Sequence, residues 1–294
     1  MNAERETRDW LKLPSDVTVS ILSRLGTVEI LNNTQYVCSQ WRNICKDPSM
    51  WTTIDMGNSC DVLNLDYGLQ KLCFHAVDRS CGRLIDINLE SIGSDQLLTY
   101  IAGRSGHLKR LRLVSCYNVS DEGLTAAVAK FPFLEDLEIS YCPITKNALE
   151  TIGSACPLLN SLKFNVEGCK RYFSECDDDA LAIAQTMPKL RHLQLFGNKL
   201  TDNGLQAILD GCPRLESLDL RKCFNVRLGG NVEKRCVERV KHLRRPYDST
   251  HDYEFEAQIH YASGISCIDL KPEDYDDYVE FSGDSDLSDY GDFH

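Results

Sequence analysis

The sequence predicts an α/β repeat fold: a three-helix unit at the front, a short arc of strand–helix repeats, and an acidic disordered tail. Three observations predict this class. One leucine pattern recurs through the middle of the chain, the segment before it has helical periodicity, and acidic residues crowd the end. The 294 residues, 43% of them hydrophobic and 26% charged, suit a chain with a substantial core.

The leucine pattern has the form LxxLxL and returns at a nearly constant interval. Its copies begin at Leu84, Leu108, Leu134, Leu159, Leu190 and Leu215, which gives spacings of 24, 26, 25, 31 and 25 residues. This period and core are the signature of leucine-rich repeats, each of which supplies a strand and a helix. Because one repeat cannot bury its apolar face alone, neighbours stack and bend the array into an open arc.

Within each repeat the two elements follow from local patterns. Alternation in the LxL strand points two apolar side chains inward and the residues between them outward. A helix then begins at good N-cap chemistry, as at Ser120 and Thr201, and its apolar residues return at helical spacing, as in Leu205, Ile208 and Leu209.

The outward-facing strand residues would line the concave surface of the arc. The predicted substrate-binding residues are Arg110, Arg112, Glu138, Lys163, His192, Phe196 and Asp219. Such a mixed surface selects a partner by the register of its charges, and Phe196 is the aromatic anchor expected of a hot spot. The alternative, that these are ordinary solvated side chains, stays open.

The spacing of 31 residues marks an insertion of about six residues relative to the common period, most plausibly within residues 166–176. It contains Lys170, Arg171, Tyr172 and Phe173. Because insertions in repeats form loops that often bind partners, this loop is expected to contribute to substrate contact.

At the front, residues 1–9 are polar and expected to be flexible, and residues 10–51 carry three short helical patterns. In the first, Val17, Ile21, Leu22 and Leu25 form one apolar stripe, and Gly26 is placed to end the helix. Helices this short bury little on their own. The unit therefore either caps the repeats or presents an apolar face to a partner.

Five pieces of the front follow one another in a recognisable order: Leu13-Pro14, Ile21-Leu22 with Leu25, Val37-Cys38, Trp41-Arg42, and Asp47-Pro48-Ser49-Met50-Trp51. This order resembles the F-box motif, and with the repeats behind it the chain is similar to plant-type F-box/leucine-rich-repeat proteins. The polar loop at residues 32–34 departs mildly from that pattern.

The resemblance implies a non-catalytic receptor subunit of an SCF-type cullin–RING ubiquitin ligase, acting in the nucleus or cytoplasm. The F-box would dock on a Skp1-like adaptor, and through it on cullin, while the repeats hold a target protein for ubiquitination. The adaptor-binding residues that the resemblance implies are Leu13, Pro14, Val17, Ile21, Leu22, Leu25, Val37 and Trp41.

Two segments join these parts and close them. Residues 52–83 read as a degenerate first repeat, with a helix from Leu65 to Val77, that couples the front rigidly to the arc. Residues 84–247 hold the repeats and end in a predicted capping helix, Val232 to Leu243. Residues 248–294 form the acidic tail, which is predicted to be largely disordered.

The formal net charge of −12 belongs to that tail. Residues 248–294 hold fourteen acidic groups and one basic group, so residues 1–247 carry a net charge of +1. Residues 221–247 carry +7, and the basic side of their helix could attract the acidic tail. Nucleic-acid binding by this helix is a weaker alternative, because Val232, Cys236, Val240 and Leu243 give it an apolar seam.

Other functions lack their residues. The chain has no apolar run of membrane-spanning length and no signal-peptide pattern at Met1. The fourteen cysteines show no CxxC pair and are expected to be free, mostly buried thiols; the histidines are scattered, and Asp177-Asp178-Asp179 reads as a surface turn rather than a metal site. Neither catalysis nor a cofactor is expected. The remaining alternative is a ligase-independent protein-binding scaffold.

Overall fold

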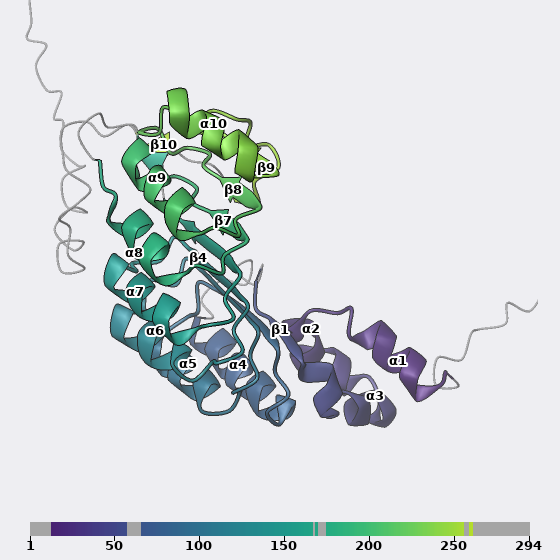
Figure 1. Cartoon of the computed structure of the whole chain (residues 1–294). Helices are drawn as coiled ribbons and strands as arrows, with labels where there is room; N and C mark the ends of the chain where they lie inside the picture. The colour runs from purple at the N-terminus through teal and green to yellow at the C-terminus, as the bar shows by residue number, and fades with distance from the viewer. Residues whose placement is uncertain (1–12, 58–65, 167, 170–174, 256–258, 261–294) are drawn as a thin grey trace, which may run out of the picture.

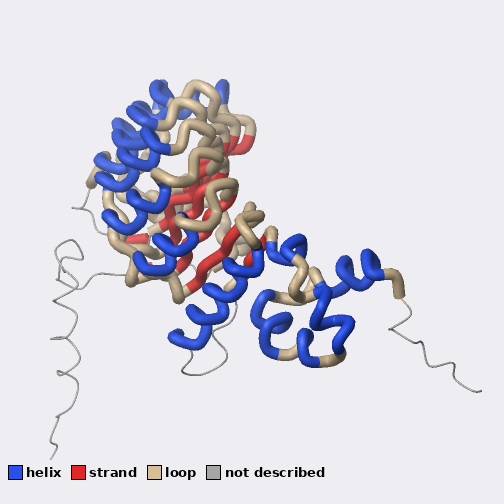
Figure 2. The backbone as a smooth tube through the Cα atoms, turned by 90° about the horizontal axis from the view of Figure 1, so that it is seen from below, coloured by secondary structure: helices blue, strands red, loops and turns tan. Residues whose placement is uncertain are grey.

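The computed structural model describes residues 13–57, 66–166, 168–169, 175–255 and 259–260. The repeats form a curved two-layer body, with strands along the inner face and helices along the outer face, and the front unit (residues 13–51) projects from one end (Figures 1 and 2). The predicted α/β repeat class is confirmed.

Eight parallel strands make up the sheet, in the order β1-β2-β3-β4-β5-β7-β8-β9. The strands are β1 (Thr53–Asp55), β2 (Asp86–Glu90), β3 (Arg110–Val114), β4 (Asp136–Ser140), β5 (Ser161–Asn165), β7 (His192–Gln194), β8 (Ser217–Asp219) and β9 (His242–Arg244). The outer helices are α4 (Asp66–Ser80), α5 (Asp95–Ala102), α6 (Asp121–Val128), α7 (Lys146–Ala155), α8 (Asp178–Thr186), α9 (Asp202–Gly211) and α10 (Gly230–Arg239).

The leucine pattern fixes the register of this sheet. Ile87 lies opposite Leu111, and Leu111 opposite Leu137, so equivalent apolar residues form a continuous ladder. The ladder residues of every LxL strand, from Ile87 and Leu89 to Leu218 and Leu220, are at most 2% exposed. Burial of each such side chain stabilises the fold by about 1.5–3 kcal/mol. The predicted repeats are thus in place from Leu84 onward.

The convex layer is tied together by carboxylates that reach from one repeat to the next. Asp95 accepts hydrogen bonds from the backbone N–H and the hydroxyl of Ser120, the residue that caps the following helix α6, at 2.8 and 2.7 Å. Asp177 makes the same pair of bonds to Thr201, at 2.7 and 2.8 Å. Each cap therefore also sets the stacking distance between neighbouring helices.

Glycines allow the helices to approach this closely. A Cβ added to Gly211, the last residue of α9, would lie 2.1 Å from the carbonyl oxygen of Ala184 in α8. Backbone atoms cannot yield as a flexible side chain can, so the position requires glycine. A Cβ added to Gly106, in a turn of an earlier repeat, would have no atom within 4 Å apart from those of its neighbours in the chain.

We predict that Gly211→Ala lowers the free energy of unfolding by about 1–3 kcal/mol, because α8 and α9 must separate to admit the methyl group. Gly106→Ala is the matched control and should stay within about 0.5 kcal/mol of the parent chain. Urea denaturation followed by circular dichroism measures both. Equal stabilities of the two variants would contradict the close packing of α8 on α9.

The front unit comprises α1 (Ser15–Leu22), α2 (Thr27–Asn32), a 3-10 turn η2 (Thr34–Tyr36), α3 (Ser39–Ile44) and a 3-10 turn η3 (Pro48–Trp51). The predicted helix end at Gly26 is wrong: α1 ends at Leu22, and Gly26, in extended conformation, is the N-cap of α2. The unit shares one continuous hydrophobic core with the repeats, through Trp51, Ile54 and Val77.

The joint agrees with its prediction. Strand β1 pairs with β2 at the start of the sheet, and α4 covers the predicted helical stretch from residue 66 onward. The chain enters the sheet immediately after η3, so no tether separates the front unit from the repeats. The predicted flexible segment 1–9 lies outside the described residues.

The end of the array differs from its prediction. Helix α10 stops at Arg239 and does not reach Leu243, because Val240 adopts an extended conformation and the chain turns into β9. Leu243 therefore continues the apolar ladder opposite Leu218. This last repeat was not recognisable in the sequence, because His242-Leu243-Arg244 keeps only one leucine of the pattern.

Seven of the cysteines in the described part of the chain are buried and none of those described is in a disulfide. Burial raises the pKa of the Cys73 thiol to about 12, and burial also raises the pKa of Cys156 and of Cys212 to about 11. These side chains pack as small apolar groups, as predicted, and Cys81 and Cys176 are exposed.

At pH 8 we expect iodoacetamide to alkylate Cys81 and Cys176 in the native chain and to leave Cys73, Cys156 and Cys212 unmodified. The cause is twofold: the buried thiols are shielded, and their raised pKa values keep the reactive thiolate scarce. Peptide mass spectrometry before and after denaturation measures the difference. Rapid native labelling of Cys73 would show that α4 does not pack as described.

Candidate protein-binding surfaces

The front unit leaves one apolar face in solvent. Helix α1 buries Thr18 and Leu22 against the unit, at 2% and 1% exposure, and turns Val17 and Ile21 outward at 40% and 37%. Positions 17 and 21 share one face of a helix, and positions 18 and 22 lie about 100° around it. The prediction that Leu22 faces a partner is therefore wrong, because Leu22 anchors α1 to its own unit.

Most of the other predicted adaptor residues of the front unit are also exposed. Leu25 and Val37 are 37% and 62% exposed, Pro14 is exposed, and Leu13 is half-buried. Trp41, also implied to bind the adaptor, is half-buried and packs on the core. Tyr36, beside Val37, is 65% exposed and was missed; its position next to a predicted contact residue was the available signal.

The connection between this face and the repeats is rigid. The guanidinium of Arg79, on α4, donates to the carbonyl oxygen of Cys45 and, at 2.8 Å, to the side-chain oxygen of Gln35. It also lies 5.3 Å from the ring centroid of Trp51. Trp51 itself is buried, and its indole N–H donates to the carbonyl oxygen of Cys45 at 2.9 Å.

We predict that Arg79→Ala uncouples the two parts. All three tryptophans (Trp10, Trp41 and Trp51) lie in the predicted F-box, so tryptophan fluorescence reports this part while circular dichroism is dominated by the repeats. In the parent chain the two urea transitions should coincide. In the variant fluorescence should change first, with a loss of about 1–3 kcal/mol in the front unit.

Arg83→Ala, at an exposed position just beyond α4, is the matched control and should leave the two transitions coincident. If the Arg79 variant also keeps them coincident at the parent midpoint, Arg79 does not couple the parts.

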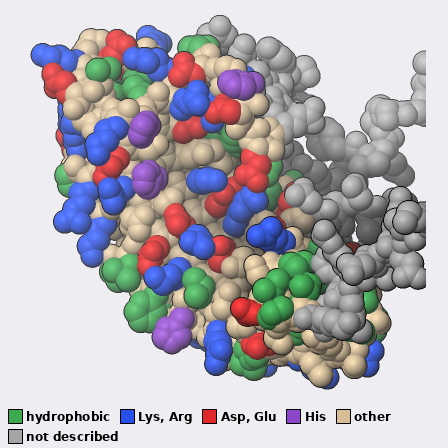
Figure 3. All heavy atoms as spheres, turned by 90° about the vertical axis from the view of Figure 1, so that its right-hand side faces the viewer, with side chains coloured by type: hydrophobic (Ala, Val, Ile, Leu, Met, Phe, Trp, Pro, Cys, Tyr) green, Lys and Arg blue, Asp and Glu red, His purple; other side chains and the backbone are tan. Residues whose placement is uncertain are grey.

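The second surface is the concave face of the sheet. Its charges pair across neighbouring strands: Arg110 lies 2.8 Å from Asp86, while Glu138 meets Arg112 at 3.2 Å and Lys163 at 2.9 Å. Figure 3 shows acidic, basic and histidine side chains interspersed on the face it presents. The predicted mixture of charges is present, and these ion pairs neutralise much of it within the protein.

The C-terminal segment (residues 248–255) crosses this face at the carboxyl ends of the strands. The ring of Tyr253 stacks on Phe196 with the ring centroids 3.7 Å apart and the planes 2° from parallel. Its hydroxyl is 2.9 Å from that of Tyr141, and burial followed by this hydrogen bond raises the pKa of Tyr253. Phe196, predicted as an exposed anchor, is only 1% exposed, because Tyr253 covers it.

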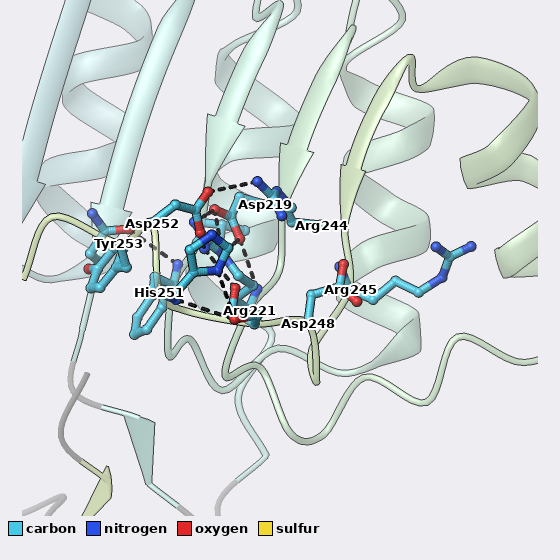
Figure 4. Close-up of polar contacts among 12 residues, drawn as sticks. Asp219, Arg221, Arg244, Arg245, Asp248, His251, Asp252 and Tyr253 are labelled. Carbon is cyan, nitrogen blue, oxygen red and sulfur yellow. Dashed lines mark hydrogen bonds and ion pairs between the residues drawn. The ribbon is translucent and has the colours of Figure 1, made fainter. Parts of the chain in front are cut away.

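Three arginines hold the acidic side chains of the C-terminal segment. Asp252 accepts hydrogen bonds from Arg221 and, at 2.7 Å, from Arg244 (Figure 4). Partial desolvation opposes these cations, but their hydrogen bonds and charges keep the pKa of Asp252 below its usual range. Glu254 lies 2.6 Å from Arg112. The predicted attraction of the acidic tail to the basic side of the terminal helix is not what these contacts show: Arg221 and Arg244, outside the helix, and Arg112, within β3, hold the segment.

Of the remaining predicted concave residues, His192 is exposed, Lys163 is half-exposed, and Asp219 is 8% exposed and bound at 2.7 Å by Arg221. Tyr141, Arg221 and Arg244 were missed. Beside the C-terminal segment the concave face is hollowed by a cavity of about 650 Å³. Its lining includes Lys163, His192, Asp219, Lys241, His242 and Arg244.

Two predicted partner features have limited support. Within the insertion, the short strand β6 (Gly168–Cys169) is described and pairs with β10 (Ile259–His260). The predicted contact residues Lys170, Arg171, Tyr172 and Phe173 lie outside the described residues.

On the basic terminal helix, Arg235 pairs with Asp210 and Lys234 lies 3.9 Å from Glu238. This pairing weakens the nucleic-acid alternative.

The acidic run at residues 177–179 does not converge on a site. Asp177 binds Thr201, Asp178 lies 2.9 Å from Lys146, and Asp179 accepts from Asn198 at 3.0 Å. Among the described residues no three His, Cys, Asp or Glu side chains are grouped to hold a metal ion. No helix in the described part combines the length and apolarity needed to cross a bilayer.

A three-helix unit with an exposed apolar face, fixed to one end of a leucine-rich-repeat arc, defines a protein-binding receptor. Residues 10–57 match the F-box-like family model, and residues 168–241 match the model for the LRR repeats of FBD-associated F-box protein At5g56370. The chain belongs to the plant F-box/leucine-rich-repeat family. It is 50% identical to F-box protein SKIP19 of Arabidopsis thaliana over 98% of this chain and 95% of that protein.

Two further similarities were found. The chain is 53% identical to F-box/LRR-repeat protein 23 of Arabidopsis thaliana over 84% of its own length and 55% of that protein. The leucine-rich repeat-containing protein LegL7 from Legionella pneumophila is a solved structure with 13% identity and a TM-score of 0.45, covering 78% of this chain and 77% of that one. Family membership supports the role of an F-box substrate receptor, a role generally associated with SCF complexes.

Proposed function

We propose that this chain is the non-catalytic substrate receptor of an SCF-type ubiquitin ligase, acting in the nucleus or cytoplasm. The observation that carries the proposal is the exposed apolar face of Val17 and Ile21, with Leu25 and Val37 also exposed, on a unit that matches the F-box-like model. Apolar side chains grouped on one face of a small helical unit are typical of a protein interface. A Skp1-like adaptor covers this face and connects the chain to cullin.

The rigid joint supports the same proposal. Because Arg79 and Trp51 fix the front unit against α4, the distance between the adaptor and a target bound on the repeats is set by the fold. A ligase scaffold requires such a fixed distance, since the ubiquitin-carrying enzyme approaches from the cullin side. The target binds the concave face over the 650 Å³ cavity, where His192 and Lys163 remain accessible.

We predict that Val17→Asp with Ile21→Asp weakens capture of a Skp1-like adaptor by at least about 100-fold. Each side chain contributes about 1.5–3 kcal/mol when buried, and the new carboxylates would have to be desolvated at the interface. Surface plasmon resonance with the immobilised adaptor measures the change, and circular dichroism checks that the variant is folded.

The control is Val237→Asp with Leu181→Asp, which places the same charges on exposed apolar positions of the repeats, 59% and 41% exposed in the parent chain. Capture should be unchanged in this variant. If the front-unit variant still binds the adaptor normally while folded, the docking assignment fails and a ligase-independent scaffold becomes the better account.

A further inference from the structure

The C-terminal segment lies in a site built for a particular side-chain order. From Asp252 to Phe255 the chain reads Asp-Tyr-Glu-Phe, and each of these side chains has its own partner. Asp252 lies between Arg221 and Arg244, Tyr253 stacks on Phe196, Glu254 meets Arg112, and Phe255 packs edge-on against Tyr141 at 5.5 Å. Cationic and aromatic side chains alternate along the site. This order is complementary to the acidic and aromatic residues that alternate along the segment.

The residues that form this site lie in the strands of the sheet or directly after them, so the sheet fixes their positions. Arg221 is held by three hydrogen bonds to the carboxylate of Asp219, at 3.1, 3.1 and 2.7 Å, with its remaining nitrogen directed at Asp252 and the carbonyl oxygen of Ser249. Phe196 follows β7 in the ladder of repeats, and Arg112 lies within β3. The receptor half of the contact is therefore preorganised by the repeats themselves.

The occupant is bound less completely than the receptor half. Asp252 and Glu254 are exposed, and Tyr253 and Phe255 are only partly covered. The Arg112 guanidinium divides its charge between the segment and the sheet, because Nη2 lies 2.6 Å from the carboxylate of Glu254 and Nε lies 3.2 Å from that of Glu138.

From this arrangement we propose that the concave face is a binding site for an acidic–aromatic peptide segment of a target protein, and that residues 252–255 occupy it in cis until such a segment displaces them. The inference rests on the proposed receptor function and names the class of ligand that the receptor takes. Displacement uncovers Phe196, Arg112 and Arg221 together and joins them to the neighbouring cavity, which Asp219 and Arg244 also line.

The tether sets how strongly the cis segment competes. A segment joined to its site by a few residues acts at an effective concentration of about 1 mM. A free peptide that binds the open site with a dissociation constant of about 100 μM then appears roughly tenfold weaker in the intact chain. The order acid, tyrosine, acid, phenylalanine recurs with one residue inserted at 277–281 and 289–293, so a test must silence these copies as well.

The test uses the full chain and a fluorescein-labelled peptide with the sequence of residues 249–256, Ser-Thr-His-Asp-Tyr-Glu-Phe-Glu. The opened variant carries Asp252→Asn, Tyr253→Ala, Tyr278→Ala and Tyr290→Ala. Fluorescence anisotropy should show about tenfold tighter peptide binding to the opened variant than to the parent chain, with an affinity that falls as salt is raised. A peptide with Asn and Ala in place of its Asp and Tyr should not bind.

Two controls isolate the site. Tyr117→Ala with Tyr247→Ala removes tyrosines that are 69% and 76% exposed and should leave peptide affinity at the parent value. Arg112→Gln in the opened variant should lower affinity at least about fivefold, since it removes the partner of Glu254 while Lys163 still pairs with Glu138. If the opened variant does not fold, the isosteric pair Asp252→Asn and Glu254→Gln replaces it, with about threefold tighter binding expected.

Equal affinity of the parent and opened chains, or equal binding of the substituted peptide, would overturn the inference. Adaptor capture is measured on the same variants and should be unchanged, because every substitution lies outside residues 13–51 of the front unit in the sequence. Loss of peptide binding with intact capture therefore refutes the ligand class alone, and unchanged capture in the folded front-unit variant refutes only the ligase assignment.

Discussion

The in-register stacking of the leucine ladder is the constraint on which the rest of the structure depends. Once Leu111 lies between Ile87 and Leu137, the outward residues of those strands are aligned by the same register. That alignment brings Arg112, Glu138 and Lys163 into one row and pairs their charges. The burial of apolar side chains on one side of the sheet thus determines the electrostatics of the other side, which faces any partner.

A stack of repeats has two ends, and each would expose the ladder to solvent if left open. At the first end β1 and α4 close it, with the front unit packed behind them through Trp51. At the other end α10 and the single-leucine strand β9 do so. The first closure has a second consequence. The front unit that packs behind β1 and α4 also carries the exposed face of Val17 and Ile21. The same packing that completes the core therefore holds this face in a fixed position.

Much of this could be predicted from the sequence, because periodic burial leaves a periodic pattern. The strands around Leu111, Leu137 and Leu162 follow from spacing alone, and the α4 joint follows from the apolar and helical pattern of residues 52–83. Leu22 could not be assigned in the same way, since an apolar residue beside an exposed stripe looks the same whether it faces inward or outward. Leu243 was misplaced because one leucine in a basic stretch fits a helical seam as well as a strand.

The fate of Phe196 shows a different limit. Register correctly placed it on the outward side of the sheet, but register says nothing about a distant segment of the chain. Contacts between Tyr253 and Phe196 join residues far apart in sequence, and no local pattern encodes them. The charge balance did carry a signal: residues 221–247 are strongly basic and the residues after them strongly acidic.

This charge balance explains how the concave face can have its charges neutralised and still bind a target segment. Arginines with no acidic neighbour in the sheet would be costly to hold half-buried, and unpaired cations would also bind acidic chains indiscriminately. Arg221 is neutralised within the sheet by Asp219, while Arg244 and Arg112 share their charge with Asp252 and Glu254 of the C-terminal segment. The C-terminal segment neutralises these cations until a target binds. A target segment must displace it, and only a segment with matching side chains does so. Selectivity then comes from the order of acid and ring along the ligand, because bulk negative charge satisfies the arginines and leaves Phe196 bare.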